Sequence, residues 1–289
     1  MTDLPLRGFG AVVVGGSRGI GAAVAALLAE LGAGVVVNGR DPEPVEATVS
    51  SIVANGGQAV GLPGSASDGA VAEGLISLCE NEFGRINALI NCAGTAEPTG
   101  SSILDVSPQE FQDLIDVHLG TVFATCRAAA PRMVAHGGGS IVNTSSFAFL
   151  GDYGGTGYPA GKGAVNGLTM AIAAELAEHG VRANVVCPGA KTRLSTGADF
   201  EQQIESLRRR GMLDEVSAQS ALDAAPPEYA ASLYAYLVSD LSSRVTGQIL
   251  IAAGGFVGRF DRPAPALLGY RNHDASPPWS ISEIDRMFS

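Results

Sequence analysis

Short apolar runs alternate along the chain with longer segments whose apolar residues recur at helical spacing. The short runs are rich in β-branched residues and are bounded by glycine or polar residues, which is typical of strands. We expect strands at 9–14, 35–38, 58–62, 88–91, 140–144, 181–187 and 248–251, and helices at 19–31, 42–55, 68–83, 108–135, 158–179 and 227–239. The polar segment 201–219 is expected to form a mobile helical cap.

Strands that are apolar throughout and separated by helices indicate a parallel sheet that is covered on both faces. Seven such units predict one doubly wound α/β domain of the Rossmann type, with a seven-stranded parallel sheet, over residues 1–260. The composition changes from about Asp261, because residues 261–289 are rich in Pro, Arg and aromatic residues. We expect this C-terminal extension to pack on its own subunit or on a neighbouring one.

Composition narrows the possible partners. Apolar residues make up 46% of the 289 residues and the net charge is -11, so the chain is expected to be globular and to repel nucleic acid. The four cysteines are widely spaced, which favours neither a metal site nor a disulfide framework. Residues 1–10 do not resemble a secretory leader and every apolar run is too short to span a bilayer, so we expect a cytoplasmic protein without a membrane partner.

A glycine-rich turn joins the first expected strand to the first expected helix, at the place where a dinucleotide pyrophosphate can sit on a helix N-terminus. Gly15 would permit the turn, Gly19 would let the backbone approach the phosphates, and Gly21 would let helix and strand pack closely. The candidate cofactor-binding residues of this turn are Gly15, Ser17, Arg18, Gly19, Ile20 and Gly21.

The end of the second expected strand bears on the choice of cofactor. An NAD-preferring site usually has a carboxylate here, but this chain has Gly39 followed by Arg40. Arg40 and Arg18 together would suit a 2′-phosphate, so NADP is expected in preference to NAD. If both arginines are simply solvated surface residues, NAD remains open.

A tyrosine and a lysine four residues apart lie on one expected helix face, in the sequence Tyr158-Pro-Ala-Gly-Lys162. A free phenol has a pKa of about 10, and a nearby ammonium lowers that pKa, so Tyr158 could serve as a general acid or base. The segment Asn143–Ser146 ends a strand and offers serine hydroxyls to a substrate oxygen. The same spacing alone would also fit a surface pair.

These segments, in this order, resemble the short-chain dehydrogenase/reductase family over about residues 6–255. The motifs that carry the resemblance are Gly15–Gly21, Asn91–Gly94, Asn143–Ser146, Tyr158–Lys162, Pro188-Gly189 and Val245–Gln248 with Gly254-Gly255. The resemblance implies that Tyr158 transfers the proton, that Lys162 holds the nicotinamide ribose and tunes the tyrosine, and that Ser146 orients the substrate oxygen.

The resemblance also implies contacts to the cofactor from other loops and a quaternary structure. One segment supports the sheet beside the cofactor and another lies along the nicotinamide carboxamide. The expected contacts outside the glycine turn are Arg40, Asn91, Ala93, Gly94, Tyr158, Lys162, Pro188, Gly189 and Thr192. Members of the family are usually dimers or tetramers, so we expect a homodimer or homotetramer.

The chain departs from the family pattern around the cofactor and in the proton relay. Val14 precedes the first glycine where the family often has Thr, and Ser65 stands where an adenine-binding Asp is common, with Asp68 further on. His118 takes the place of an Asn that often anchors a water in the proton relay. His118 could hold that water or could simply pack beside the site.

The assignment of the catalytic serine is affected by spacing. Ser146 lies twelve residues before Tyr158, whereas the usual family gap is one residue longer and would select Ser145. A one-residue deletion in the glycine-rich stretch 151–157 is the simpler account, because such a loop can absorb it. We therefore favour Ser146 and leave Ser145 as the alternative.

The combined prediction is an NAD(P)-dependent oxidoreductase that interconverts a ketone and a secondary alcohol of a small apolar molecule. Residues 188–195 and 254–259 also resemble the reductase module of peroxisomal multifunctional β-oxidation enzymes, which implies a 3-hydroxyacyl or steroid-like substrate. Arg208–Arg210 could meet an acidic group such as a CoA phosphate, or could form a solvated helix face. The alternatives are a low-turnover cofactor-binding sensor or assembly subunit, and a nucleotide-dependent epimerisation or dehydration.

Overall fold

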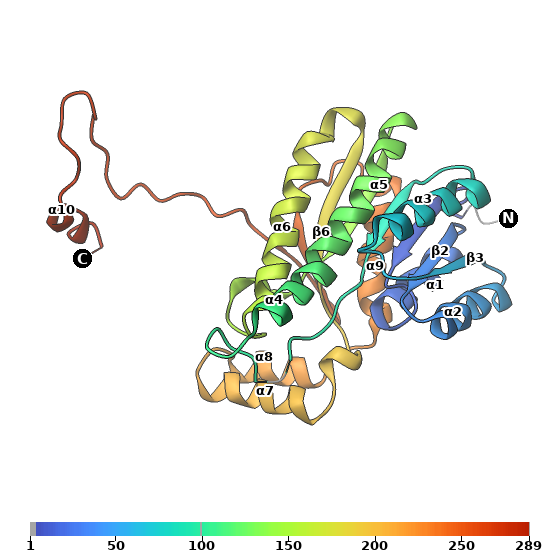
Figure 1. Cartoon of the computed structure of the whole chain (residues 1–289), viewed down its shortest axis with the longest axis horizontal. Helices are drawn as coiled ribbons and strands as arrows, with labels where there is room; N and C mark the ends of the chain where they lie inside the picture. Colours follow the sequence, from blue (N-terminus) through green and yellow to red (C-terminus); the bar gives the residue numbers. More distant parts are fainter. Residues whose placement is uncertain (1–3, 99, 289) are drawn as a thin grey trace.

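A central sheet with helices on both faces forms the body of the molecule in a computed structural model that describes residues 4–98 and 100–288 (Figure 1). Within these residues the sheet has eight strands in the order β3-β2-β1-β4-β5-β6-β7-β8. The strands are β1 (Gly10–Val14), β2 (Gly34–Gly39), β3 (Gln58–Pro63), β4 (Ala88–Asn91), β5 (Gly139–Thr144), β6 (Val181–Gly189), β7 (Ile249–Ala253) and β8 (Phe256–Phe260). The predicted doubly wound α/β class is confirmed.

The predicted number of strands was wrong by one. Strands β1 to β7 are parallel as expected, but β8 adds to the edge in the antiparallel sense, pairing Phe256 with Ala253 and Phe260 with Ile249. The turn between the two strands is made by Gly254-Gly255, and Gly254 has the positive φ of 56° that such a tight reversal favours. The sequence predicts Gly254-Gly255 only as part of a family motif, and the hairpin that these glycines allow was not predicted.

The helices follow the predicted order, with more breaks than expected. Their bounds are α1 (Gly19–Glu30), α2 (Pro42–Ala54), α3 (Gly69–Phe83), α4 (Pro108–Ile115), α5 (Thr121–Ala135), α6 (Gly157–Glu175), α7 (Ala198–Arg209), α8 (Glu215–Leu222), α9 (Pro227–Val238) and α10 (Ile281–Asp285). The predicted single helix 108–135 is α4 and α5 joined by a π-helical turn, Asp116–Gly120. Among the described residues, no helix is both long and apolar enough to cross a bilayer.

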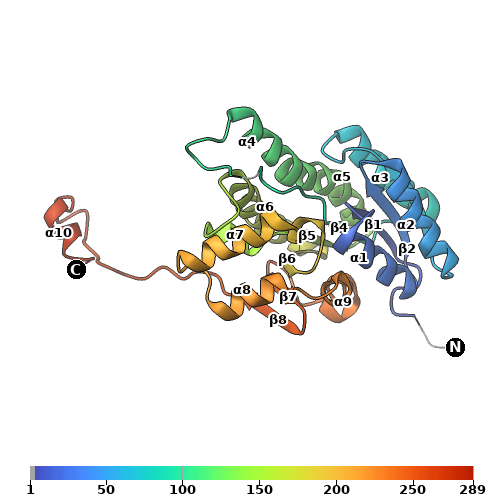
Figure 2. The same ribbon diagram turned by 90° about the horizontal axis from the view of Figure 1, so that it is seen from below.

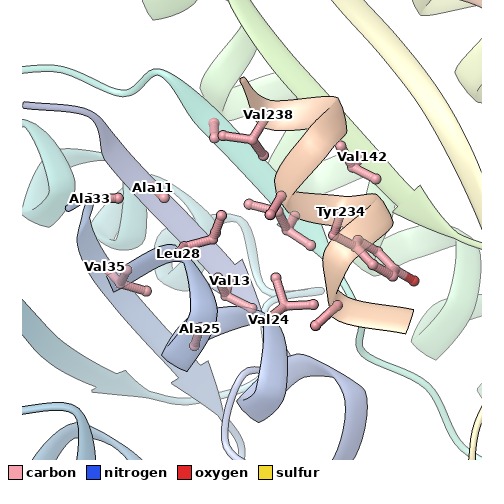
Figure 3. Packing of buried hydrophobic residues seen from close by; sticks show 14 of the residues in the cluster. Ala11, Val13, Val24, Ala25, Leu28, Ala33, Val35, Val142, Tyr234 and Val238 are labelled. Carbon is pink, nitrogen blue, oxygen red and sulfur yellow. The ribbon is translucent and has the colours of Figure 1, made fainter. Parts of the chain in front are cut away.

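Two apolar layers bury the sheet. One face packs against α1, α2 and α9, where Val24, Leu28 and Tyr234 lie over Ala11 and Val13 of β1 (Figure 3). The other face packs against α3, α5 and α6. Every residue of β1 is buried, as a strand covered on both sides requires.

The order of the strands indicates which edge of the sheet can bind a ligand. The chain runs outward from β1 to β2 and β3, and then returns to the other side of β1 with β4. In such sheets ligands bind outside the carboxyl ends of the strands where the order reverses. The loops that follow β1, β4, β5 and β6 therefore meet at one edge.

The C-terminal extension leaves the sheet domain as an extended arm that ends in α10 (Figures 1 and 2). Contacts inside the arm hold its end together: the guanidinium of Arg271 lies 3.7 Å from the ring centroid of Trp279 and 2.6 Å from a carboxylate oxygen of Glu283. Several apolar side chains on the arm are exposed, among them Leu267 and Tyr270. In this structure the arm reaches away from its own domain, and contact with a neighbouring subunit stays a prediction.

Candidate active site

The glycine turn after β1 is built by close contacts that leave no room for side chains. A Cβ on Gly15 would lie 2.6 Å from the backbone nitrogen of Ala93, and a Cβ on Gly21 would lie 2.1 Å from the carbonyl oxygen of Gly15. Gly15 and Gly19 also have positive φ angles of 72° and 53°. Ile20 packs against the core beneath the turn. The turn therefore brings bare backbone to the edge of the sheet.

The N-terminus of α1 is suited to an anion. The helix begins at Gly19; Arg18 makes no side-chain cap, and the first turn carries no acidic residue. The first backbone NH groups are thus left for an outside partner, and the helix dipole favours a negative one. This arrangement fits the pyrophosphate of a dinucleotide, as the sequence predicts.

At the predicted ribose-binding corner, Arg18 forms an ion pair with a residue that was not predicted from the sequence. A guanidinium nitrogen of Arg18 lies 3.1 Å from a carboxylate oxygen of Asp41, just beyond the tip of β2. Ser17 packs on Gly39, where a Cβ would lie 2.3 Å from the serine hydroxyl, and Arg40 is exposed. Because the Arg18–Asp41 pair is itself exposed, it is worth little and Arg18 can exchange partners readily.

The segment after β4 supports the site from below. The Asn91 side chain donates to the amide oxygen of Asn143 at 2.9 Å and accepts from the Thr125 hydroxyl at 2.9 Å. Asn91 is therefore a buried tie between β4, β5 and α5. Ala93 touches the glycine turn, and a Cβ on Gly94 would lie 3.2 Å from His118 and 3.7 Å from the Lys162 nitrogen.

The loop after β6 forms the opposite wall. Pro188 and Gly189 end β6, and a Cβ on Gly189 would lie 2.8 Å from the Cβ of Ala253. The methyl group of Thr192 lies 3.5 Å from where a Cβ on Gly19 would be. The backbone NH of Thr192 donates to Ser195 at 2.9 Å. These residues therefore face the glycine turn across the site.

Tyr158 and Lys162 lie one turn apart at the start of α6, as predicted. The Lys162 ammonium lies 5.7 Å from the centroid of the Tyr158 ring and donates to the carbonyl oxygen of Thr144 at 3.0 Å. Lys162 is buried, and its burial lowers its pKa to about 8. Lys162 thus links α6 to the end of β5.

The expected effect of Lys162 on the phenol was wrong for this structure. Burial raises the pKa of Tyr158, while a hydrogen bond with Ser146 works in the opposite direction. Burial is the largest influence on the phenol, because the Lys162 ammonium donates to a backbone carbonyl rather than to the phenol oxygen. Tyr158 is therefore protonated at neutral pH, which suits proton donation.

The two serines after β5 point in different directions. The Ser146 hydroxyl accepts from the backbone NH of Ala148 at 3.2 Å, and it lies near the phenols of Tyr158 and Tyr153, where it acts to lower the pKa of both. Ser145 is buried, and its hydroxyl donates to the carbonyl oxygen of Lys162 at 3.1 Å. The geometry favours Ser146 as the serine that meets a substrate oxygen.

His118 lies in the π-helical turn, 1% exposed, with its ring 5.0 Å from that of Tyr158 in an edge-to-face arrangement. Its Nε2 lies 3.0 Å from the carbonyl oxygen of Thr95 and therefore carries the proton. Nδ1 is then an acceptor, and it is buried without a partner among the described residues. Burial, followed by the charge of Lys162, lowers the pKa of His118 to about 3, so the ring is neutral.

Tyr153 is a residue of the site that sequence reasoning missed. It lies near the Ser146 hydroxyl, as Tyr158 does, and packs against Ile204 and Leu207 of α7. Burial raises its pKa to about 12. Tyr153 was not predicted because the glycines of 151–157 indicate only a loop, without a motif that would point to a functional residue. Tyr153 connects the reacting groups to the helical cap.

Other predicted residues lie outside this cluster. Ser65 hydrogen-bonds Ser67, and Asp68 caps α3 by accepting from the NH of Ala70. Arg208 pairs with Glu205 and Glu215 on the cap, which agrees with a solvated helix face. Among the described residues, no group of three His, Cys, Asp or Glu side chains is placed to hold a metal ion.

Comparisons with known proteins agree with this geometry. Residues 14–257 match the model of a family described as Enoyl-(Acyl carrier protein) reductase. A 3alpha-hydroxysteroid dehydrogenase of Mediterraneibacter gnavus is 36% identical over 247 residues, which cover 84% of this chain and 95% of that protein. A 3-oxoacyl-[acyl-carrier-protein] reductase of Synechocystis is 34% identical over 252 residues, covering 86% of this chain and 96% of that protein.

A solved structure extends the similarity to the arm. The crystal structure of a short chain dehydrogenase from Mycobacterium avium superposes with a TM-score of 0.81 at 28% sequence identity. The alignment covers 98% of this chain and 94% of that chain. That protein therefore has a segment that corresponds to much of the C-terminal extension.

Replacing Gly15 with alanine tests the glycine turn. The new methyl group would meet Ala93 at 2.6 Å and the residue would keep a positive φ, so we expect dinucleotide affinity to fall at least about 10-fold and the thermal midpoint to drop. Gly8→Ala is the control, because Gly8 has a φ of 79° with nothing within 4 Å. Equal affinity in both variants, measured by titration of nicotinamide fluorescence, would contradict the assignment.

Proposed function

The chain belongs to the short-chain dehydrogenase/reductase family of oxidoreductases, and we propose that it interconverts a ketone and a secondary alcohol with Tyr158 as general acid and base. One observation carries the proposal: the phenol of Tyr158, the hydroxyl of Ser146 and the ammonium of Lys162 lie between the end of β5 and the start of α6, and the Ala93-Gly94 segment links them to the glycine turn before α1. The residues present fit a nicotinamide dinucleotide, which supplies or accepts a hydride when bound.

In the reductive direction, Ser146 donates a hydrogen bond to the carbonyl oxygen and holds it beside Tyr158. Tyr158 hands its proton to that oxygen as the carbonyl carbon gains the hydride, which completes the alcohol. Lys162 stabilises the phenolate that remains. In the oxidative direction each transfer is reversed, and Tyr158 takes the proton from the alcohol.

His118 is proposed as part of the path that returns the proton to Tyr158. Nδ1 of His118 and the Lys162 ammonium both lie beside Gly94, 3.5 and 3.7 Å from where its Cβ would be. A buried acceptor without a partner is costly unless a water or another donor reaches it. Nδ1 is therefore suited to hold a relay water next to Lys162. The alternative is that the ring only packs against Tyr158.

The proposed substrate is a 3-hydroxyacyl or steroid-like molecule. The proteins named above are a hydroxysteroid dehydrogenase and a 3-oxoacyl reductase, and both names indicate a ketone or secondary alcohol on a carbon skeleton. Helix α7 packs Ile204 and Leu207 against Tyr153, so the site has an apolar cluster beside it. Arg208 is paired with carboxylates, so the basic run does not favour a CoA phosphate.

Replacing Tyr158 with phenylalanine tests the mechanism. We expect the kcat for NADPH-dependent reduction of a ketone panel to fall about 10²- to 10⁴-fold, since the proton donor is lost while the ring is kept. In the unsubstituted protein the reductive rate should persist through neutral pH and fall at alkaline pH, where the phenol loses its proton; alcohol oxidation should rise with pH.

Matched serine variants serve as the control. Ser146→Ala should lower kcat strongly, whereas Ser145→Ala should act mainly on stability, because Ser145 is bound to the Lys162 carbonyl. Full ketone-reducing activity of Tyr158→Phe would contradict the proposed mechanism. Tight cofactor binding without turnover of any ketone or alcohol in the unsubstituted protein would favour the sensor alternative, and turnover without net change in nicotinamide absorbance would favour epimerisation or dehydration.

We propose NADP over NAD as the preferred cofactor, on account of Arg40 and Arg18 at the tip of β2. Arg40→Ala should raise the KM for NADPH by about 10-fold and leave the KM for NADH within about 2-fold, because only the former has a 2′-phosphate to lose. Arg244→Ala offers a charge-matched control outside this corner. A parallel change in both KM values would contradict the preference.

The arm is proposed to dock on a second copy of the chain in a homodimer or homotetramer. Trp279 is the single tryptophan and lies on the arm, so its emission should report docking and shift to the red on dilution. Tyr270→Asp should lower the mass measured by light scattering, since the Tyr270 side chain is 81% exposed. Ala275→Asp is the control, because it adds the same charge to the arm at a nearby position. A monomeric unsubstituted protein would contradict the proposal.

A further inference from the structure

A single carboxylate joins the loop after β4 to the start of the catalytic helix. Glu97 accepts hydrogen bonds from the backbone NH groups of Thr156 and Gly157, both at 3.0 Å, and from the NH of Tyr158. The hydroxyl of Ser101 donates to the same carboxylate at 2.9 Å. The carboxylate thus serves four donors, three of them on the backbone that carries Tyr158.

Glu97 supplies a cap that α6 does not supply for itself. Thr156 occupies the N-cap position without a side-chain cap, and the first turn of α6 contains no acidic residue. Helix starts leave their first NH groups without partners, and a negative charge there is stabilising. The partner comes from about 60 residues earlier, so it fixes α6 against the end of β4.

The glycine-rich loop 151–157 is shaped around this carboxylate. Gly155 has a φ of 77°, and a Cβ on it would lie 2.6 Å from the carboxylate carbon of Glu97. A Cβ on Gly157 would lie 2.6 Å from Leu114 and 3.5 Å from a carboxylate oxygen of Glu97. The loop therefore closes over Glu97 because Gly155 lacks a side chain, and the lack of a side chain at Gly157 leaves room for Leu114.

We propose that Glu97 is a positioning residue for Tyr158, holding the first turn of α6 so that the phenol stays between Ser146 and Lys162. The inference deepens the proposed function and rests on it, because it assigns to Glu97 the placement of the proton donor. Both carboxylate oxygens are needed, since one serves Thr156 and Gly157 and the other serves Tyr158.

Glu97→Ala in the full chain tests the positioning role. We expect kcat for ketone reduction to fall about 10- to 100-fold while the affinity for NADPH changes less than about 3-fold, since displacement of a reacting group acts on the chemical step. The apparent pKa of Tyr158 in the pH profile of kcat/KM should shift, because a displaced phenol no longer has the burial and the Ser146 neighbour that set this pKa. Glu97→Gln keeps one acceptor oxygen and should recover part of kcat.

Glu110→Ala controls for the loss of a helix cap. Glu110 closes a capping box with Ser107 at the start of α4, so its removal should lower the thermal midpoint but leave kcat and the pH profile unchanged. If Glu97→Ala lowers the thermal midpoint in the same way with an unchanged kcat and pH profile, Glu97 is only a structural cap and the proposal is overturned.

Two further variants, Gly155→Ala and Tyr158→Phe, distinguish failure of the proposed role of Glu97 from failure of the proposed function. Gly155→Ala should lower kcat more in the unsubstituted protein than in Glu97→Ala, where the clash with the carboxylate is gone; additive effects would count against the proposed packing. Tyr158→Phe is assayed alongside. If Tyr158→Phe stays active, the proposed function fails first; if it is inactive and Glu97→Ala matches the unsubstituted protein, only the role of Glu97 fails.

Discussion

The site depends on the burial of one ammonium group. Lys162 is 4% exposed, yet its charge must be kept, and the carbonyl oxygen of Thr144 is the acceptor that allows this. The same bond joins α6 to the end of β5. The charge of Lys162 adds to the effect of burial, which is the larger cause of the neutral state of His118.

A network of buried hydrogen bonds links β4, β5, α5 and α6 beneath the site. Asn143 donates to Thr169 of α6 at 2.9 Å and accepts from Asn91, which in turn accepts from Thr125 of α5. Buried polar groups are stabilising only when each finds its partner. Here the amides of β4 and β5 satisfy one another and the two helices above them, so strands and helices keep a fixed spacing under Tyr158.

Much of the fold could be predicted because it follows from periodicity. Valine-rich runs such as β1 have no stable place except between two helical layers, and the glycine turn is fixed by contacts to Ala93. The eighth strand was missed because an edge strand with exposed residues lacks the apolar run that marks a buried one. The π-helical turn at His118 was missed because one extra residue barely changes a helical pattern.

The site was predictable where chemistry and spacing coincide, as at Tyr158 and Lys162. It was not predictable where long-range packing decides. The pKa of Tyr158 rises through burial, which spacing does not reveal. Tyr153, Asp41 and Glu97 join the site through segments that only the folded sheet brings together.

The distant origin of the cap on α6 has a consequence for how the molecule assembles. A peptide with the sequence of residues 157–175 would keep the tyrosine–lysine spacing but would start with unpaired NH groups and fray there. In the chain, that first turn is completed by Glu97, so it requires the segment after β4 to lie against the start of α6. A fragment that begins after Glu97 would therefore contain the tyrosine–lysine motif but would leave these three NH groups without their partner.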